Sequence, residues 1–261
     1  MLGGGYSGVE VATNIASYLG KKKSKISIID RSDKIMKNSP ENNRKSAESS
    51  LNSLDIKSYL QTSALRVSKD AVHCKNLNGD IFDVQADIAI FTTGMEQSSL
   101  LSKIQLLKDS SGRIAVNQSL QCKSKPNVFA LGDCSGINNH LIPSTAQAAM
   151  QQSDIVAKNL LYRINNYKFD DLTEKASRPD ELEKFRFISL GEMLTLGSTD
   201  GAVSSLNGLI QLNGPFAAVA RRLVYAARMP TKNQSVTALV STGQAAVVKA
   251  RKFFFSKLFD N

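Results

Sequence analysis

The chain has 261 residues, of which 42% are hydrophobic, and its formal net charge is +10. This length allows one large domain or two modest ones, and no apolar run approaches the roughly 20 residues of a membrane-spanning helix. The positive charge favours anionic partners, but the basic, aromatic stretch 249–257 matches no nucleic-acid-binding motif, so we expect no nucleic acid partner. Three cysteines without a Cys-x-x-Cys spacing and two distant histidines predict neither a dithiol centre nor a metal site.

The sequence opens on a glycine-rich turn that leads into a helical pattern. Gly3, Gly5 and Gly8 have the G-x-G-x-x-G spacing, in which the glycines permit a tight turn, close approach of a pyrophosphate and close helix packing. Apolar positions then predict a helix to about Leu19, and its N-terminus favours phosphate. The candidate phosphate loop consists of Gly3, Gly4, Gly5, Tyr6, Ser7 and Gly8.

A short strand, Lys25–Asp30, is predicted after this helix and ends in a carboxylate. An acidic residue about 20 positions after such a loop can hold a ribose 2′-hydroxyl. Asp30 therefore favours NADH, but Arg31 can offset this by attracting a 2′-phosphate, and both dinucleotides stay open. The alternative, a glycine-rich turn beside an unrelated aspartate, requires three features to coincide by chance. Only Met1 and Leu2 stand where a full strand would precede the loop, so we expect a truncated chain or an incomplete gene model.

The next stretch predicts one helix, Pro40–Leu54, and several short strands. Asn78-Gly79 is a hairpin signal between two of them, and the last strand reads as buried. The predicted strands are Lys57–Thr62, Ala64–Val67, Ala71–Lys75, Ile81–Val84 and Asp87–Thr93. The first 95 residues therefore predict one βαβ-containing nucleotide domain.

A second glycine-bearing turn follows in the middle of the chain. After a short strand at Ile114–Val116, an apolar strand at Asn127–Leu131 runs into Gly132-Asp133, and a helix is predicted from Thr145 to about Leu161. Glycine permits close approach, and the aspartate can accept hydrogen bonds from flavin ribityl hydroxyls. The start of the helix can face an electron-rich ring.

The order of these motifs resembles the type II NADH:quinone oxidoreductases, which are flavoproteins with two dinucleotide-binding folds. The resemblance is carried by the glycine loop, Thr92-Thr93-Gly94, the stretch 128–133 and the Gln147/Gln151 pair, and it covers nearly the whole chain. The stretch 185–197 is similar to the plant and cyanobacterial C1-type branch, which includes a plastid enzyme acting on demethylphylloquinone and plastoquinone.

The resemblance implies an α/β fold class with Rossmann-like domains that bind FAD and NAD(P)H, truncated at the start, with C-terminal amphipathic helices. It divides the chain into an NAD(P)H-binding domain (1–95), the C-terminal part of an FAD-binding domain (96–165), and a connector with a membrane-docking region (166–261). The glycine fingerprint that holds the flavin adenosine would lie upstream of Met1, so we expect this chain alone to retain flavin poorly.

The resemblance also implies the site residues, with FAD and NADH or NADPH as cofactors. Glu10 would help proton movement near the nicotinamide, and Gln147 and Gln151 would line the quinone tunnel. Alternatively, Glu10 only stabilises the dipole of its helix, and Gln151 is an ordinary exposed helix residue. Besides the phosphate loop, the cofactor-binding residues would be Asp30, Thr93, Gly94, Gly132, Asp133, Thr145, Ala146 and Gln147.

The C-terminal region combines basic and aromatic residues. Helices are predicted at Gly214–Arg228 and Gln244–Phe259, and lysines beside the Phe253–Phe255 run suit an interfacial helix on anionic lipid. For the stretch Phe216–Val224, packing into the protein's own core is the alternative. The resemblance implies the same membrane surface.

The predicted function is a flavin-dependent NAD(P)H:quinone oxidoreductase, peripheral on an organellar membrane, with the chloroplast (thylakoid or plastoglobule) favoured over the mitochondrion. Its partner would be a membrane quinone: plastoquinone, demethylphylloquinone or ubiquinone. A homodimer is compatible with the resemblance. The alternatives are another reductase of the same superfamily, such as one acting on ferredoxin, and a non-catalytic remnant that binds only nucleotide or membrane.

Overall fold

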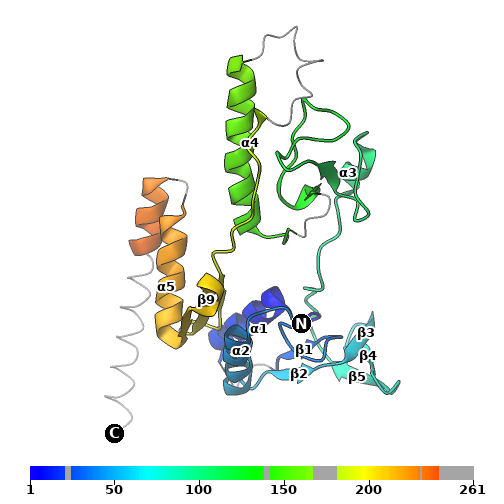
Figure 1. Cartoon of the computed structure of the whole chain (residues 1–261). Helices are drawn as coiled ribbons and strands as arrows, with labels where there is room; N and C mark the ends of the chain where they lie inside the picture. The colour runs from blue at the N-terminus through cyan, green and yellow to red at the C-terminus, as the bar shows by residue number, and fades with distance from the viewer. Residues whose placement is uncertain (21–24, 138–141, 167–180, 230, 241–261) are drawn as a thin grey trace. The chain divides into compact units, whose positions relative to one another are not determined.

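The computed structural model describes residues 1–20, 25–137, 142–166, 181–229 and 231–240. The chain forms two compact units, one made of Met1–Gly94 with Leu190–Asn261 and the other of Met95–Ser189. Both units mix helices with short strands (Figure 1), which confirms the predicted α/β class.

Parallel pairing beside the glycine-rich turn forms the centre of the first unit. Strand β1 (Ser27–Ile29) pairs in parallel with β2 (Lys57–Tyr59). Leu2, just before the turn, forms parallel bridges to Ile29 on one side and to Phe91 on the other. The turn is thus fixed to two neighbouring backbone segments at its entry.

Two helices pack beside this pairing. Helix α1 (Tyr6–Leu19) ends at Gly20, whose φ of 76° suits glycine, and helix α2 (Glu41–Ser53) begins directly after Pro40. Both were predicted and are confirmed. The buried residues of α1 recur at helical spacing because one face packs against the core: Gly8, Val9, Ala12, Thr13 and Ala16.

An antiparallel three-stranded sheet follows, in the order β3-β4-β5, with β3 at Thr62–Val67, β4 at Ala71–Asn76 and β5 at Ile81–Gln85. The predicted hairpin between β4 and β5 is confirmed, and Gly79 in its turn has a φ of 93°. One face of this sheet is buried with Leu2 and β1 in a small apolar core.

The predicted buried strand Asp87–Thr93 is wrong. Among the described residues, this segment pairs only with Leu2, whose N–H donates to Ile90 O (2.8 Å) and whose carbonyl accepts from Thr92 N (2.8 Å). Ile88 is 78% exposed and Phe91 is 66% exposed. A strand buried on both faces needs cover on both sides, and the described part of the chain does not cover these side chains.

A second antiparallel sheet, which the sequence did not predict, belongs to the first unit. Its order is β10-β9-β8, with β8 at Glu192–Thr195, β9 at Gly201–Ser205 and β10 at Ile210–Asn213, the last two joined by the short 3₁₀ helix η5 (Leu206–Gly208). Leu194, Leu196 and Ala202 pack in the same core as helices α1 and α2.

Helix α5 (Gly214–Ala227) follows β10 and has a proline in its first turn. It confirms the helix predicted at Gly214–Arg228. Phe216 is 80% exposed, and Val219 and Leu223 are about half exposed. The alternative in which this face packs into the protein's own core is therefore not supported within the described residues.

The second unit is built on one long helix and a short parallel pair. Helix α4 (Ala146–Asn166) confirms the predicted helix and extends it by about five residues. Strand β6 (Ile114–Val116), also predicted, pairs in parallel with β7 (Ser135–Ile137). Over its described residues, the second unit also contains a short helix, α3 (Ser99–Lys103), and the 3₁₀ turn η1 (Gly132–Cys134).

The predicted strand Asn127–Leu131 is wrong. It forms a single bridge, from Phe129 to Gln121, inside a tight reversal in which Cys122 N donates to Val128 O (2.8 Å). In the part of the chain that the structure describes, the reversal pairs this segment only with its own preceding residues. The strand that extends the sheet is β7, which begins after the Gly-Asp turn rather than before it.

The region 166–261, expected as one connector and docking segment, is divided between the units, because the second ends at Ser189 and the first resumes at Leu190. The predicted helix Gln244–Phe259 lies outside the described residues, as does most of the connector Tyr167–Glu183. Over the described ranges, no helix has the length and apolar character needed to cross a bilayer.

Candidate functional site

Close backbone approach shapes the glycine loop. Gly3 has a φ of 109°, and a Cβ there would lie 2.7 Å from Thr92 O. A Cβ on Gly8 would overlap the Gly3 carbonyl oxygen and lie 2.8 Å from Thr92 Oγ1. Gly5, by contrast, is exposed and has no heavy atom within 4 Å of its added Cβ. Gly3 and Gly8 are thus required by the fold itself, whereas Gly5 leaves open space outside the loop.

Thr92 clamps the loop and was not among the predicted site residues. Its hydroxyl lies 2.9 Å from Leu2 O and 3.1 Å from Gly3 O, within hydrogen-bonding distance of both. The predicted residues Thr93 and Gly94 are exposed. The Thr-Thr-Gly stretch contains two candidate hydroxyls, and only one side of an extended segment can face the loop. The sequence therefore indicates a hydroxyl here, but only the structure selects Thr92.

The Asp30 carboxylate lies against the loop, as the sequence predicts for the acidic partner. It accepts hydrogen bonds from Gly4 N (2.5 Å) and Ser32 N (2.7 Å). Burial raises its pKa, but these hydrogen bonds and the Arg31 charge outweigh burial and hold the pKa below its usual value. A carboxylate has about four acceptor positions, so Asp30 can still accept from a ribose hydroxyl.

The Tyr6 side chain is half-buried and has polar partners. Its hydroxyl contacts Ser39 Oγ (2.6 Å) and the Glu192 carboxylate on β8. Burial raises the pKa of Glu192. Ser7, the next predicted residue, is exposed at the start of α1. Tyr6 therefore joins the loop to β8, a contact that sequence spacing cannot reveal.

Glu10 also joins α1 to the C-terminal part of the first unit. Its Oε1 accepts a hydrogen bond from Thr195 N (2.7 Å) and lies 3.6 Å from Arg221 Nη2 on α5. The Arg221 guanidinium also stacks 4.6 Å from the centre of the Tyr225 ring. The carboxylate is therefore already engaged by two groups, and a role in proton movement stays a prediction.

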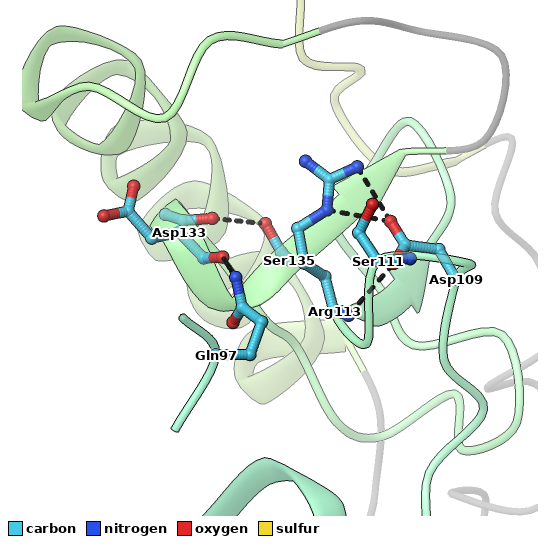
Figure 2. Close-up of polar contacts among 7 residues, drawn as sticks. Gln97, Asp109, Ser111, Arg113, Asp133 and Ser135 are labelled. Atoms are coloured by element: carbon cyan, nitrogen blue, oxygen red, sulfur yellow. Dashed lines mark hydrogen bonds and ion pairs between the residues drawn. The ribbon is translucent and has the colours of Figure 1, made fainter. Parts of the chain in front are cut away.

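The second site lies in the second unit, where the Gly-Asp turn meets the start of α4. Gly132 has a φ of 68°, and its N–H donates to Gln152 Oε1 (2.5 Å). Gln152 is buried and was missed, because a buried glutamine on a helix looks like any polar helix residue in sequence. Ser135 Oγ donates to Gly132 O (3.0 Å) and Gln97 Nε2 to Asp133 O (3.3 Å) (Figure 2).

The Asp133 side chain is exposed, and no group in the described residues donates to its carboxylate. It lines a small pocket together with Gly132, Thr145, Gln152 and Arg113. Thr145 caps α4 by accepting from Ala148 N (3.3 Å). An acceptor with no protein donor beside a glycine with positive φ fits a hydroxyl-bearing ligand such as a ribityl chain.

The remaining predicted residues lie along the first turns of α4. Ala146 is exposed and Gln147 is partly buried. The Gln151 amide forms two hydrogen bonds with the Ile188 backbone, through Ile188 O (2.8 Å) and Ile188 N (3.0 Å). Gln151 therefore holds an extended segment, and the prediction that it lines a quinone tunnel stays a prediction.

Comparison with known proteins identifies the family of the chain. The model of the pyridine nucleotide-disulphide oxidoreductase family matches residues 1–153. Demethylphylloquinone reductase NdbB of Synechocystis sp. is 38% identical over 242 residues, which are 91% of this chain and 55% of that protein. Alternative NAD(P)H-ubiquinone oxidoreductase C1, chloroplastic/mitochondrial, of Arabidopsis thaliana is 33% identical over 88% of this chain and 46% of its own length.

Solved structures agree on the fold. NDH2 from Plasmodium falciparum, in complex with NADH, matches 92% of this chain and 63% of its own chain with a TM-score of 0.75 at 16% identity. The sulfide:quinone oxidoreductase of Aquifex aeolicus matches 84% of this chain and 54% of its own with a TM-score of 0.61 at 16% identity. The chain spans about half the length of the curated relatives it matches. The predicted similarity to the plant and cyanobacterial branch is confirmed, and the chain belongs to the pyridine nucleotide-disulphide oxidoreductase family.

Proposed function

We propose that this chain forms part of a flavin-dependent NAD(P)H:quinone oxidoreductase of type II. The observation that carries the proposal is a pair of glycine-bearing turns, one per unit, each with a carboxylate beside it. The first turn leads directly into α1, and the second is hydrogen-bonded to α4 through Gln152. The names and identities of the two curated relatives support the same activity. When bound, FAD supplies the chemistry, accepting a hydride from the nicotinamide and passing two electrons to quinone.

The chain's own residues would bind and orient the dinucleotide and the flavin. The loop N–H groups and the start of α1 would hold the dinucleotide pyrophosphate, and Asp30 would accept from the adenosine ribose. Asp133 would accept from the ribityl hydroxyls of the flavin, and the start of α4 would face its ring. Because Asp30 is ionised and fixed by Gly4 and Ser32, we expect NADH to bind more tightly than NADPH.

The test measures acceptor choice on the purified chain. Oxidation of NADH and NADPH is followed with a short-chain plastoquinone analogue, a ubiquinone analogue and ferredoxin as separate acceptors, after FAD is added. Quinone reduction supports the proposal. Reduction of ferredoxin alone would contradict it and would support the alternative, a ferredoxin-linked reductase. Flavin and dinucleotide binding without turnover would identify a binding remnant.

A membrane surface is the finer part of the proposal. Helix α5 exposes Phe216, Val219 and Leu223. Arg222 in its third turn and the exposed Arg228 at its C-terminal end add positive charge. Exposed apolar residues beside cations suit the interface of an anionic bilayer. We infer a peripheral attachment in an organelle, with the chloroplast favoured by the similarity to the cyanobacterial enzyme.

Vesicle co-sedimentation tests this attachment. The double variant Phe216→Ser with Leu223→Ser should lose binding to vesicles of phosphatidylglycerol and phosphatidylcholine. Tyr18→Ser, which removes a 90%-exposed aromatic from α1, is the matched control and should bind as the parent chain does. Equal binding of both variants would contradict a role for α5.

A further inference from the structure

A five-residue turn before β6 fixes an arginine next to the Asp133 pocket. Asp109 N donates to Arg113 O (2.8 Å), and Asp109 Oδ1 accepts from Ser111 N (2.9 Å) and Arg113 N (3.0 Å). Gly112, with a φ of 78°, allows the reversal. The aspartate thus closes the turn with its backbone and its side chain at once.

The same carboxylate also holds the arginine side chain. Asp109 Oδ2 lies 2.8 Å from both Nε and Nη2 of Arg113, and the two side chains are 13% and 23% exposed. Burial raises the pKa of Asp109, but the hydrogen bonds from Arg113 and Ser111 outweigh it and hold the pKa below its usual value. A partly buried, charge-assisted contact of this kind fixes orientation better than a surface pair does.

Strand β7 leaves room for this pair by having a glycine at its centre. A Cβ on Gly136 would overlap Asp109 Oδ2 and would lie 3.0 Å from Asp109 Cγ and 3.2 Å from Arg113 Nε. The ion pair therefore rests directly on the strand backbone. This close approach places the guanidinium at one fixed position beside the turn that carries Asp133.

Arg113 has donors left over. A guanidinium has five N–H groups in one plane, and Asp109 occupies only the Nε and Nη2 side. Figure 2 shows the other terminal nitrogen turned away from Asp109, and the Asp133 carboxylate directed away from Arg113. Arg113 lines the same pocket as Asp133, Thr145 and Gln152, and within the described residues its remaining N–H groups have no partner.

We propose that Asp109 is a positioning residue that directs Arg113 toward the phosphate end of a ribityl phosphate whose hydroxyls bind Asp133. In the described residues, the Asp133 carboxylate has no donor, and the Arg113 guanidinium has no acceptor other than Asp109. A polyol phosphate supplies both complements, since its hydroxyls donate to a carboxylate and its phosphate accepts from a guanidinium. The inference rests on the proposed flavin function and adds a phosphate-recognising residue to it.

The experiment compares flavin mononucleotide with riboflavin, which lacks the phosphate, by quenching of flavin fluorescence on the full 261-residue chain. The parent chain should bind flavin mononucleotide more tightly. Arg113→Gln should weaken its binding about ten- to a hundredfold and leave riboflavin binding nearly unchanged. Arg113→Lys should recover part of the lost affinity for flavin mononucleotide. Added salt should weaken the binding of flavin mononucleotide only in chains that keep a cation at position 113.

Asp109→Asn tests positioning, because it keeps Arg113 and removes its anchor. We expect an intermediate loss of the preference for the phosphate. Lys123→Gln removes an exposed cation of the same unit and should behave as the parent chain, and urea midpoints check that each variant is folded. If Asp109→Asn does not fold, the comparison of Arg113→Gln with Arg113→Lys tests phosphate recognition.

The outcomes separate the two proposals. If flavin mononucleotide binds and Arg113→Gln keeps the same preference over riboflavin, the Arg113 inference is overturned and the flavin site stands. If the parent chain binds both flavins equally, phosphate recognition here is likewise overturned. If neither flavin binds the parent chain, both the proposed flavin site and the Arg113 inference are overturned.

Discussion

Two alanine substitutions in the same glycine loop should have different effects on stability. Ala at position 8 places a Cβ against the Gly3 carbonyl, 3.0 Å from its carbon and 2.8 Å from Thr92 Oγ1. Carbon contacts are favourable only at about 3.5–4.0 Å, so the loop, the clamp or the helix must shift. Overpacking of this kind costs about 1–3 kcal/mol, and we expect Gly8→Ala to lose at least that much.

Ala at position 5 meets open space, and Gly5 has a φ of −76° that any residue adopts. Gly5→Ala should therefore leave the free energy of unfolding unchanged or raise it by about 0.4–1 kcal/mol, because it restricts the unfolded chain. The same Cβ projects where a pyrophosphate would approach. Gly5→Ala should therefore weaken NADH binding about tenfold or more, which corresponds to about 1.4 kcal/mol.

Urea denaturation and calorimetric titration with NADH measure the two properties separately. The expected pattern is a destabilised Gly8→Ala and a stable Gly5→Ala that binds NADH poorly. Equal stability of the two variants would refute the argument from close approach. Unchanged NADH affinity in Gly5→Ala would show that no phosphate lies against this turn.

Three further predictions concern groups beside the two sites. Gly136→Ala should destabilise the second unit by about 1–3 kcal/mol by displacing the Asp109 carboxylate. The double variant with Asp109→Asn should lose less free energy of unfolding than the two single variants together, as a double-mutant cycle in urea would measure. Because the pKa of Asp30 is lower in the folded chain, its stabilisation is present above about pH 4 and lost as pH falls through the folded pKa. The stabilities of the parent chain and Asp30→Asn should therefore converge in acid, and a constant difference from pH 7 to pH 3 would contradict this. The pKa of Glu192 is raised, so its favourable contribution is present below about pH 4 and lost as pH rises; Glu192→Gln should gain stability relative to the parent chain between pH 4 and pH 7, whereas the exposed control Glu48→Gln should not.

The sequence predicted the elements whose pattern is local. Helices α1, α2, α4 and α5 and the β4–β5 hairpin were found because apolar spacing, glycine and proline mark them without reference to distant residues. The strands β8, β9 and β10 were missed. Strand β9 is buried at four successive positions and β10 is exposed at all four, so neither has the alternation that marks a half-buried strand.

The site was predicted in part for the same reason. Motif spacing located the two glycine turns and Asp30. It could not select Thr92 over Thr93, because the choice depends on which side of an extended segment faces Gly3. It also could not indicate Gln152 or the partners of Tyr6 and Glu10, since those contacts join positions as much as 186 residues apart.

The contacts of Tyr6 and Glu10 with β8 have a consequence for folding of the nucleotide unit. Glu10 and Thr195 lie 185 positions apart, and the apolar cover that Leu194, Leu196 and Ala202 give to α1 comes from equally late in the chain. During synthesis, α1 emerges early and must wait with an uncovered apolar face until that late segment leaves the ribosome. Non-local closure of this kind is slow and exposes aggregation-prone surface, so the newly made chain should depend on chaperones more than a continuous domain of the same size.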